Sequence, residues 1–386
     1  MIRQLDIDSF RGFSKLGIHE LGQVNLLVGR NNCGKTSVLE AIHMLVATGD
    51  PSSIWHIAHG RGEYVPTERQ PPARGPEIDI SQLFHGHELG PDSRFAIADD
   101  SKRKLVATIE SAEEPGPQPS PSPLPSPSPE PYRSDETLGD TEGDFEAPAR
   151  FRLAWSRQGL LEARWEAPLT PRGSIHRGRT ARQWDELRGK WSGDHDGQPV
   201  RVVSTAGLTP EQVTSLFEDV MLTPEEHRAV DAIRTIDPGI ERIAPKSGRS
   251  YSAERGGMFV KRAGLDRPVP IGTMGDGIWR MLGLALALAK SSGGVLLVDE
   301  IDTGLHYTVM DKMWTLVTET AHRLNVQVFA TSHSRDCFES LAFVSPSAAE
   351  RGIDVSVQRL EQGASEAVAF TKDEIFMAAE RAVEVR

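Results

Sequence analysis

The sequence predicts an α/β fold in which a mixed central sheet is joined by an antiparallel β-subdomain and a helical subdomain. A glycine-rich loop separates an apolar strand at 24–28 from a helix that begins near Thr36. Alternation of apolar and polar residues predominates up to about residue 165, and helical periodicity replaces it from Thr209 onward. Further along the chain, a wholly apolar run at 295–298 has the composition of a central parallel strand.

The glycine-rich loop is Gly29-Arg30-Asn31-Asn32-Cys33-Gly34-Lys35-Thr36, which fits the phosphate-binding pattern G-x-x-x-x-G-K-[ST]. The strand before it and the helix after it argue against a chance glycine-rich turn. Such a loop directs backbone N–H groups and a helix N-terminus at one point, which suits a polyphosphate. Lys35 is predicted to reach the β- and γ-phosphates, and the Thr36 hydroxyl to ligate Mg²⁺. The candidate phosphate-binding residues here are Gly29, Asn31, Asn32, Cys33, Gly34, Lys35, Thr36 and Ser37.

Composition limits the classes of function. The net charge of −12 argues against a general nucleic-acid coat. The two cysteines and the absence of a secretory signal predict a reducing cytoplasm. The most apolar segment, 281–289, is too short to span a bilayer, so a buried helix and no membrane contact are expected.

The N-terminal part is rich in predicted strands. They lie at 2–9, 15–18, 77–83, 95–99, 105–110, 151–156 and 160–165. We expect them to form a β-subdomain beside the bound nucleotide, within an N-terminal lobe of residues 1–110 and 151–205. The lobe is interrupted by a Pro/Ser-rich and acidic insertion, 111–150, which has too little apolar surface to fold. A neutral insertion and a docking site for a proline motif both remain open.

Helix signals dominate the rest. Thr209 and Thr223 each precede Pro and Glu, a pattern typical of a helix N-terminus. The predicted helices are 210–221, 224–236, 276–289, 307–323, 334–343 and 372–383, and the strands are 240–244, 258–261, 294–298, 326–330 and one near the C-terminus. We assign 206–290 to a helical subdomain and 291–386 to a C-terminal segment, within one unit of 1–386.

Two strand ends carry the side chains that a phosphate-binding loop needs for hydrolysis. Asp299 closes an apolar strand and is predicted to hold Mg²⁺, while its neighbour Glu300 is predicted to activate the attacking water. His333 follows the next strand and is predicted to sense the γ-phosphate, although a lone histidine is often structural. The catalytic candidates are therefore Lys35, Glu300 and His333.

A second glycine turn, Gly275-Asp276-Gly277, opens the long apolar helix. Its backbone N–H groups form another candidate phosphate site at a helix N-terminus. One protomer has no use for two γ-phosphate sites, so this turn is predicted to meet the ATP of a second protomer. A simple helix cap is the alternative.

The order of these motifs resembles the head of an ABC-type ATPase in the RecF/SMC/OLD-like group. The segments that carry the resemblance are Ile7–Phe13, Gly29–Ser37, Asp299–His306 and Phe329–Ser334. The resemblance implies ATP rather than GTP, Mg²⁺, and a head-to-tail homodimer with ATP between the copies. It also implies a glutamine that ligates the metal, for which Gln82 is a weak candidate.

The chain departs from that group in three ways. Gly275 stands where the group usually has Ser, so this position offers no side-chain hydroxyl to the partner's γ-phosphate. No long heptad insert and no TOPRIM nuclease motifs are present, so a nuclease would be a separate chain. The leading hypothesis is an ATPase that controls such an effector in DNA maintenance or anti-phage defence. The alternative is a nucleotide-gated DNA-binding or scaffold module with little turnover.

A basic segment supports two interpretations. Its members are Arg172, His176, Arg177, Arg179, Arg182, Arg188 and Lys190, with Trp184 and Trp191 among them. Phosphate contacts and base stacking would suit DNA or RNA. A solvated loop is the simpler interpretation, since Asp185 and Glu186 lie inside the segment.

Overall fold

The computed structural model describes residues 1–65, 77–111, 149–170, 172–176, 198–245, 257–370 and 374–377. Three predicted features lie mostly outside these residues. They are the insertion at 111–150, the basic segment beyond His176, and the helix at 372–383. Of that last helix, residues 374–377 are described and are helical. Within the described residues, no helix is both long and apolar enough to cross a membrane.

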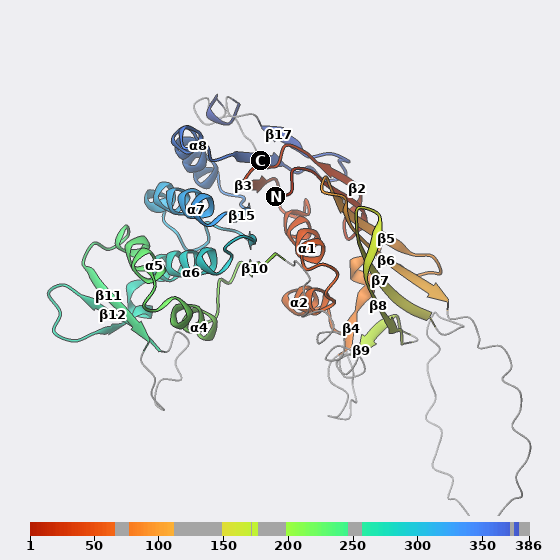
Figure 1. Ribbon diagram of the computed structural model, residues 1–386, viewed down its shortest axis with the longest axis horizontal. Coiled ribbons are helices and arrows are strands. Elements are labelled where there is room, and N and C mark those ends of the chain that lie inside the picture. Colours follow the sequence, from red (N-terminus) through yellow and green to blue (C-terminus); the bar gives the residue numbers. More distant parts are fainter. Residues whose placement is uncertain are drawn as a thin grey trace, which may run out of the picture.

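The central sheet has the strand order β10-β14-β15-β3-β16-β17 (Figure 1). All neighbours are parallel except β17, which pairs antiparallel with β16. The strands are β3 (Val24–Val28), β10 (Val200–Val203), β14 (Val295–Val298), β15 (Gln327–Thr331), β16 (Val355–Arg359) and β17 (Val368–Phe370). The predicted mixed central sheet is thus confirmed, and the strand that precedes the glycine-rich loop lies inside it.

A second, antiparallel sheet has the order β2-β1-β5-β6-β7-β8. Its strands are β1 (Leu5–Phe10), β2 (Phe13–Ile18), β5 (Arg94–Asp99), β6 (Arg103–Ser111), β7 (Ala149–Arg157) and β8 (Leu160–Pro168). Helix α1 (Lys35–Val46) lies between the two sheets (Figure 1). Trp155 of β7 donates from Nε1 to the Leu45 carbonyl oxygen at 3.1 Å, which joins this sheet to the end of α1.

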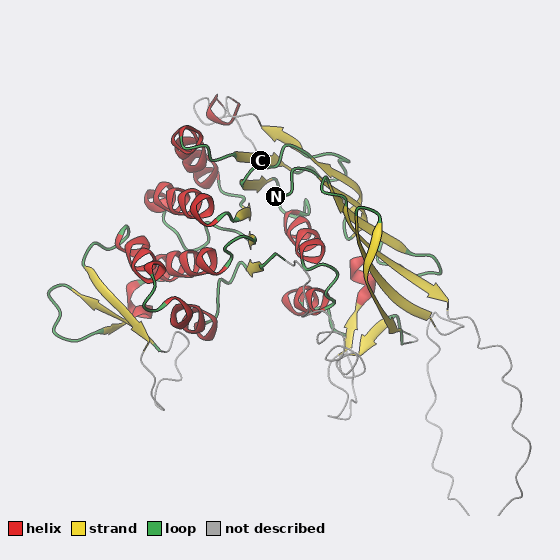
Figure 2. Cartoon of the chain, in the orientation of Figure 1, coloured by secondary structure: helices red, strands yellow, loops and turns green. Residues whose placement is uncertain are grey.

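The opposite face of the central sheet is covered by helices, as Figure 2 shows. They are α6 (Asp276–Lys290), α7 (Met310–Leu324) and α8 (Arg335–Glu350), with α4 (Pro210–Val220) and α5 (Pro224–Arg234) farther out. A small sheet of β11 (Ile240–Pro245), β12 (Met258–Arg262) and β13 (Val269–Pro270) completes that side. Thr209 caps α4 because its hydroxyl accepts from the Gln212 N–H, and the Gln212 amide oxygen accepts from the Thr209 N–H.

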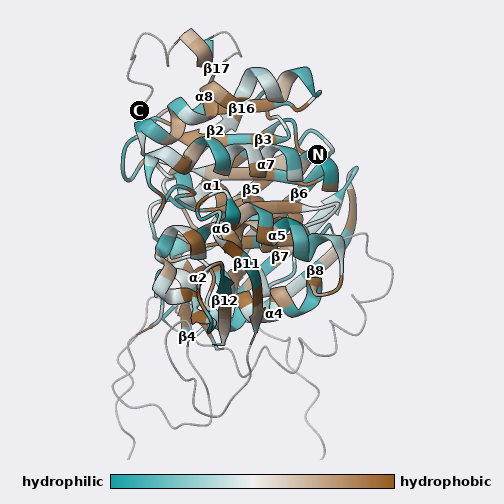
Figure 3. Ribbon diagram, turned by 90° about the vertical axis from the view of Figure 1, so that its left-hand side faces the viewer, coloured by the Kyte–Doolittle hydropathy of each residue, from teal (hydrophilic) through white to brown (hydrophobic). Residues whose placement is uncertain are grey.

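The apolar core has two parts, one on each side of the central sheet. Leu26 belongs to the part under the helices and its neighbour Leu27 to the part under the antiparallel sheet. Successive side chains of a strand point to opposite faces, so a fully buried strand such as β3 contributes to both. Coloured by hydropathy, the helices in front carry hydrophilic teal stretches, whereas many of the strands behind them are brown (Figure 3).

Several element boundaries differ from the sequence prediction. The strand expected at 77–83 is β4 (Glu77–Asp79), paired with β9 (Ser174–His176), and then a 3₁₀ turn, η1 (Ile80–Leu83). Asp79 ends the strand because its carboxylate accepts from the Ser81 N–H at 2.9 Å. The helix expected at 307–323 begins with a 3₁₀ turn, η3 (Tyr307–Val309). A short helix that was not predicted, α2 (Ser52–Arg61), follows α1.

Candidate active site

Four neighbouring parallel strands end at the same edge of the central sheet. The phosphate-binding loop follows β3, Ser332 and His333 follow β15, Asp299 and Glu300 follow β14, and Thr205 follows β10. Ligand sites in such sheets form at the carboxyl ends of the strands. The fold therefore brings the sequence-predicted acids, the histidine and the loop together.

The phosphate-binding loop requires glycine at two positions. Gly34 has φ 95°, and a Cβ there would lie 2.2 Å from Cζ of Phe13. Gly29 has φ 145°, and its Cβ would lie 2.4 Å from the Leu360 carbonyl oxygen. L-residues rarely adopt such φ values, and both contacts are too close for any side chain. Lys35 folds back over the loop, donating from Nζ to the carbonyl oxygens of Gly29 at 2.8 Å and Arg30 at 2.9 Å.

Asp299 is the centre of a group of hydroxyls. Its carboxylate accepts from Thr331 Oγ1 at 2.7 Å, from Thr205 Oγ1 at 3.0 Å and from Thr36 Oγ1 at 3.1 Å. Carboxylate and hydroxyl oxygens are the ligands that Mg²⁺ prefers, and a P-loop site needs only one or two of them because water and phosphate oxygens supply the rest. The residues present therefore fit a magnesium ion.

Glu300 is held in a strained backbone conformation with φ 46°. Its N–H donates to Thr331 Oγ1 at 2.8 Å. Its side chain is 34% exposed and lies 3.5 Å from Nδ1 of His333, while Thr303 donates to the other carboxylate oxygen at 3.3 Å. The carboxylate is thus oriented by two side chains and still open to water, as a general base requires.

Arg280 ties helix α6 to this edge of the sheet. Its guanidinium is buried and donates to the carbonyl oxygens of Ser204 at 3.1 Å, Asp299 at 3.0 Å and Glu300 at 2.7 Å. Burial lowers the pKa of Arg280, and the nearby carboxylate of Asp302 opposes that shift. The role of this residue was not predicted from the sequence, although a lone arginine within the apolar run 278–289 is a signal that could have indicated it.

The second glycine turn packs on the segment that follows Glu300. Gly275 has φ 91°, and a Cβ there would meet no atom within 4 Å, so backbone conformation rather than crowding favours glycine. A Cβ on Gly277 would lie 3.5 Å from the Gly304 carbonyl oxygen. Asp276 likewise lies against Gly304. Contact of this turn with a second protomer stays a prediction.

Gln82 does not join the metal-binding group in this structure. Its amide nitrogen lies 3.3 Å from Oδ2 of Asp79 and 3.4 Å from Oγ of Ser81, in the turn η1. The contact to Asp299 comes from Thr205 instead, because β10 is the neighbour of β14. Sequence reasoning missed Thr205, since pairing of β10 with β14 links residues far apart in the chain.

An ion-pair network clamps the start of α1. The buried Glu40 carboxylate lies 2.6 Å from Nε of Arg11 and 2.7 Å from Nε of Arg61, and Arg61 also contacts Ser37 Oγ at 3.4 Å. Burial raises the pKa of Glu40, and the two guanidinium groups oppose that shift. Arg11 bonds Glu63 as well, at 2.7 Å. The turn between β1 and β2 and the end of α2 are thereby joined to the first two turns of α1, which follow the phosphate-binding loop.

Of the basic segment, only Arg172 and His176 lie in the described residues. His176 pairs through Nδ1 with Glu77 at 3.1 Å, across the β4–β9 pair. The described part of the segment thus makes a local structural contact, and the proposal of a nucleic-acid surface gains nothing from it.

Comparison with known proteins decides the family. The profile of the family described as "AAA domain, putative AbiEii toxin, Type IV TA system" matches residues 24–336. The chain belongs to this family. With the loop, the strand-end acids and the mixed sheet in place, this AAA-domain protein has the fold of an ABC-type P-loop head, as its motifs predicted.

Individual relatives of the AAA-domain protein either have low sequence identity or match only a short segment. An "ATP/GTP phosphatase" of Helicobacter pylori is 20% identical over 350 residues, which are 88% of this chain and 87% of that protein. The "DNA replication and repair protein RecF" of Clostridioides difficile is 46% identical over 44 residues, 11% of this chain and 12% of that protein. A 55-residue match to "Uncharacterized protein MJECL10" of Methanocaldococcus jannaschii, at 36% identity, spans 14% of this chain and 25% of that protein.

Solved structures similar to this chain include SMC heads. The SMC head domain from Thermotoga maritima has a TM-score of 0.42 at 14% identity, covering 96% of this chain and 99% of that chain. A Pyrococcus furiosus Smc head with an extended coiled coil, bound to the C-terminal domain of ScpA, has a TM-score of 0.46 at 11% identity, with 99% of each chain covered.

Proposed function

We propose that this protein is a Mg²⁺-dependent ATPase. The observation that carries the proposal is the bond from Thr36 to Asp299, at 3.1 Å, which joins the phosphate-binding loop to the acid at the end of β14. A loop hydroxyl and a strand-end carboxylate in contact are the pair that holds Mg²⁺ in P-loop enzymes. The similarity to the Helicobacter pylori protein named "ATP/GTP phosphatase" also supports this proposal.

Each side chain has a distinct part in the proposed reaction. Lys35 and the N–H groups of the loop bind the β- and γ-phosphates, and Thr36 and Asp299 would hold Mg²⁺. When bound, the ion supplies positive charge to the phosphate oxygens. Glu300 accepts a proton from the water that attacks the γ-phosphorus, and His333, 3.5 Å from that carboxylate, keeps it oriented.

The proposal includes a head-to-tail homodimer in which the Gly275–Gly277 turn of one copy meets the ATP of the other. The turn begins α6, so its N–H groups carry the positive end of the helix dipole. Arg280, one turn farther along, fixes this helix to the carbonyl oxygens of Asp299 and Glu300. Closure on the partner's ATP would thus act directly on the catalytic turn.

A second candidate function is a nucleotide-gated scaffold or DNA-binding module with little turnover. Gly275 favours it, because this position offers the partner's γ-phosphate no side-chain hydroxyl. Steady-state turnover separates the two: a scaffold binds ATP and releases phosphate no faster than the Glu300→Gln variant does.

In the cell, we propose that the ATPase works in the cytoplasm and controls a separate effector, such as a nuclease, in DNA maintenance or anti-phage defence. The resemblance to the RecF/SMC/OLD-like group supports this role, and DNA contact through the basic segment is part of the same proposal. Co-expression with the product of the adjacent gene tests it. A stable complex whose nuclease activity depends on ATP is expected, and a homodimer that cuts DNA unaided would contradict it.

The ATPase itself is tested by phosphate release at saturating ATP and Mg²⁺. Lys35→Ala should abolish ATP binding, and Glu300→Gln should keep binding but slow hydrolysis by about 100-fold or more. Glu361→Gln is the matched control, since this carboxylate is 56% exposed and lies in a loop after β16. Wild-type hydrolysis in the Glu300→Gln variant would exclude Glu300 as the base.

A further inference from the structure

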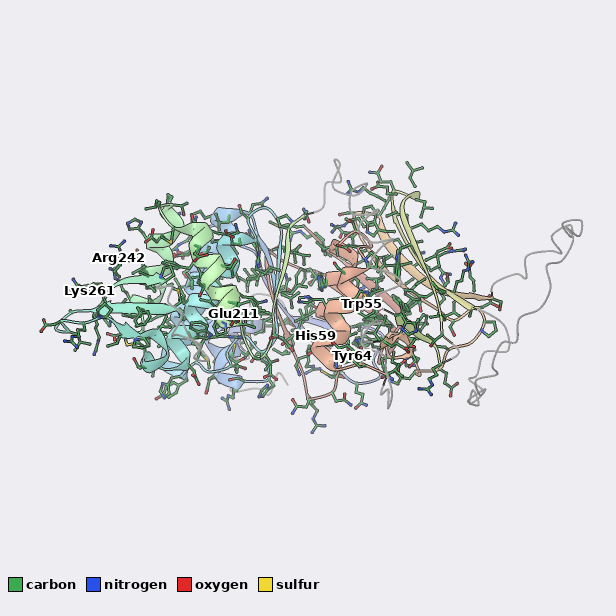
Figure 4. All side chains as sticks on the ribbon, turned by 90° about the horizontal axis from the view of Figure 1, so that it is seen from below. Trp55, His59, Tyr64, Glu211, Arg242 and Lys261 are labelled. Atoms are coloured by element: carbon green, nitrogen blue, oxygen red, sulfur yellow. The ribbon has the colours of Figure 1, made fainter. Side chains whose placement is uncertain are left out.

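A cavity of about 400 Å³ lies away from the phosphate-binding loop. Its walls are the last turn of α1, the start of α2, strand β10 and the first turn of α4. Figure 4 views the molecule from the side on which α2, with Trp55 and His59, and α4, with Glu211, are seen. The polar residues that matter in its lining are His43, His56, Asp50, Gln198, Arg201 and Gln212.

Arg201 lines this cavity, and one nitrogen of its guanidinium lacks a hydrogen bond within the described residues. Its Nε is buried and has no hydrogen-bond partner among the described residues. Burial lowers the pKa of Arg201, and the negative charge of Asp219 opposes that shift. That carboxylate is already paired with Lys290 at 2.9 Å. A half-buried cation without a partner destabilises the fold unless an anion joins it.

Two imidazoles face each other in the same wall. The rings of His43 and His56 are perpendicular, with centroids 5.8 Å apart. Burial lowers the pKa of His43 to about 4, so at neutral pH this ring is uncharged and can donate one hydrogen bond.

Little in the lining would repel an anion. Among the described residues of this cavity wall, Asp50 is the one acidic side chain, and its carboxylate already accepts from the Ser52 N–H at 2.9 Å. The lining thus combines a half-buried arginine, the uncharged imidazole of His43 and an acid that is already bonded within the chain.

We propose that this cavity binds a small anionic metabolite through a phosphate or carboxylate group held by Arg201 and the two imidazoles. Its volume is in the range that holds a small molecule. Two elements run from this cavity to the nucleotide site: α1 begins at Lys35 and ends beside it, and β10 carries Arg201 and leads to Thr205, which bonds Asp299. Occupancy is therefore coupled to the position of the Asp299 group through both.

The experiment uses inorganic phosphate as the probe and must exclude binding at the phosphate-binding loop. All variants therefore carry Lys35→Ala, and ionic strength is matched with chloride. Phosphate should raise the melting temperature of Lys35→Ala and perturb the NMR signals of His43 and His56. Citrate in a parallel titration distinguishes a carboxylate ligand, for which citrate binds and phosphate does not.

Adding Arg201→Met should weaken anion binding by at least about tenfold. The same change should raise the melting temperature without ligand, because it removes a half-buried charge whose Nε has no hydrogen-bond partner among the described residues. Arg335→Met, at an exposed arginine on α8, is the matched control and should change neither property. The proposal is overturned if neither anion shifts the melting temperature of Lys35→Ala. It is also overturned if Lys35→Ala and the double variant Lys35→Ala/Arg201→Met bind the anion equally. If the Arg201 variant does not fold, unchanged His43 and His56 signals in Lys35→Ala also overturn it.

Discussion

The guanidinium of Arg280 donates to the carbonyl oxygen of Glu300 at 2.7 Å, and that glutamate has a left-handed backbone with φ 46°. Backbone strain of this kind costs about 1–3 kcal/mol and persists only where surrounding contacts impose it. The contacts here are Arg280 on the carbonyl side and Thr331 on the N–H side. Helix α6 and strand β15 together therefore set the backbone conformation of Glu300, the proposed general base.

Replacing Arg280 should lower the turnover of ATP and leave ATP binding almost unchanged. Arg280→Lys keeps the charge but cannot reach the carbonyl oxygens of Ser204, Asp299 and Glu300 together. We expect turnover to fall at least about tenfold with little change in the KM for ATP, and the free energy of unfolding to fall by about 1–3 kcal/mol. A positioning role would be contradicted if turnover fell while the free energy of unfolding stayed unchanged. It would also be contradicted if the free energy of unfolding fell while turnover stayed unchanged. Steady-state kinetics and urea unfolding measure both.

Thr205→Val should weaken the response to Mg²⁺. The change removes one hydroxyl that donates to Asp299 at 3.0 Å and leaves the shape of the side chain almost unchanged. Loss of a residue that orients a metal ligand typically costs about 10–100-fold in metal affinity. We expect the Mg²⁺ concentration for half-maximal turnover to rise within that range. Thr315→Val, on the exposed side of α7, is the control, and an equal effect there would exclude Thr205 from the site.

Gly34→Ala should abolish nucleotide binding through a clash with Phe13. The added Cβ would lie 2.2 Å from the ring, at a residue with φ 95°. Gly293→Ala is a matched control, because Gly293 also has a positive φ, 72°, but no atom within 4 Å of its Cβ. The control should lose about 1–2 kcal/mol of stability and still bind ATP. Partial recovery of binding in Gly34→Ala with Phe13→Ala would identify the clash as the cause; fluorescence of a labelled ATP analogue reports it.

Glu300→Gln should accumulate a dimer in the presence of ATP and Mg²⁺. Slow hydrolysis keeps ATP between the two copies, so light scattering after gel filtration should report twice the monomer mass. Gly277→Glu in the same background should return the monomer, because it places a negative charge on the turn that would face the partner's phosphates. A monomer in the Glu300→Gln variant with ATP and Mg²⁺ would contradict the head-to-tail arrangement.

Stability should fall between pH 6.5 and 4 because of His43. Its pKa is lowered from 6.5 to about 4 in the folded protein by burial, with a further contribution from His56. Below pH 6.5 the unfolded chain binds a proton that the folded chain does not, so the free energy of unfolding decreases as pH falls and reaches its low limit near pH 4. The loss is up to about 3 kcal/mol. His43→Gln should flatten this dependence in urea unfolding at pH 7 and pH 5, while His306→Gln, at an exposed position, should leave it unchanged.

Much of the site was visible in the sequence because it lies in short, contiguous segments. Gly29–Ser37 and Asp299–Glu300 each fall directly after an apolar strand, and local pattern is sufficient to find them. Arg280 and Thr205 were not found, since their roles depend on which strands and helices become neighbours. Gln82 was a candidate from its place in the chain, and its bonds to Asp79 and Ser81 keep it in its own turn.

The sequence by itself determined the class of the protein: a P-loop followed by a strand-end Asp-Glu pair allows few folds other than a nucleotide-binding α/β sheet. Only the tertiary structure decided which hydroxyls surround Asp299, because parallel pairing of β10 with β14 brings Thr205 across 94 residues to that carboxylate. It also decided that Nε of the half-buried Arg201 lies in the interior with no hydrogen-bond partner among the described residues. Burial and strand pairing depend on contacts between residues that are far apart in the chain, so a local sequence pattern does not predict them.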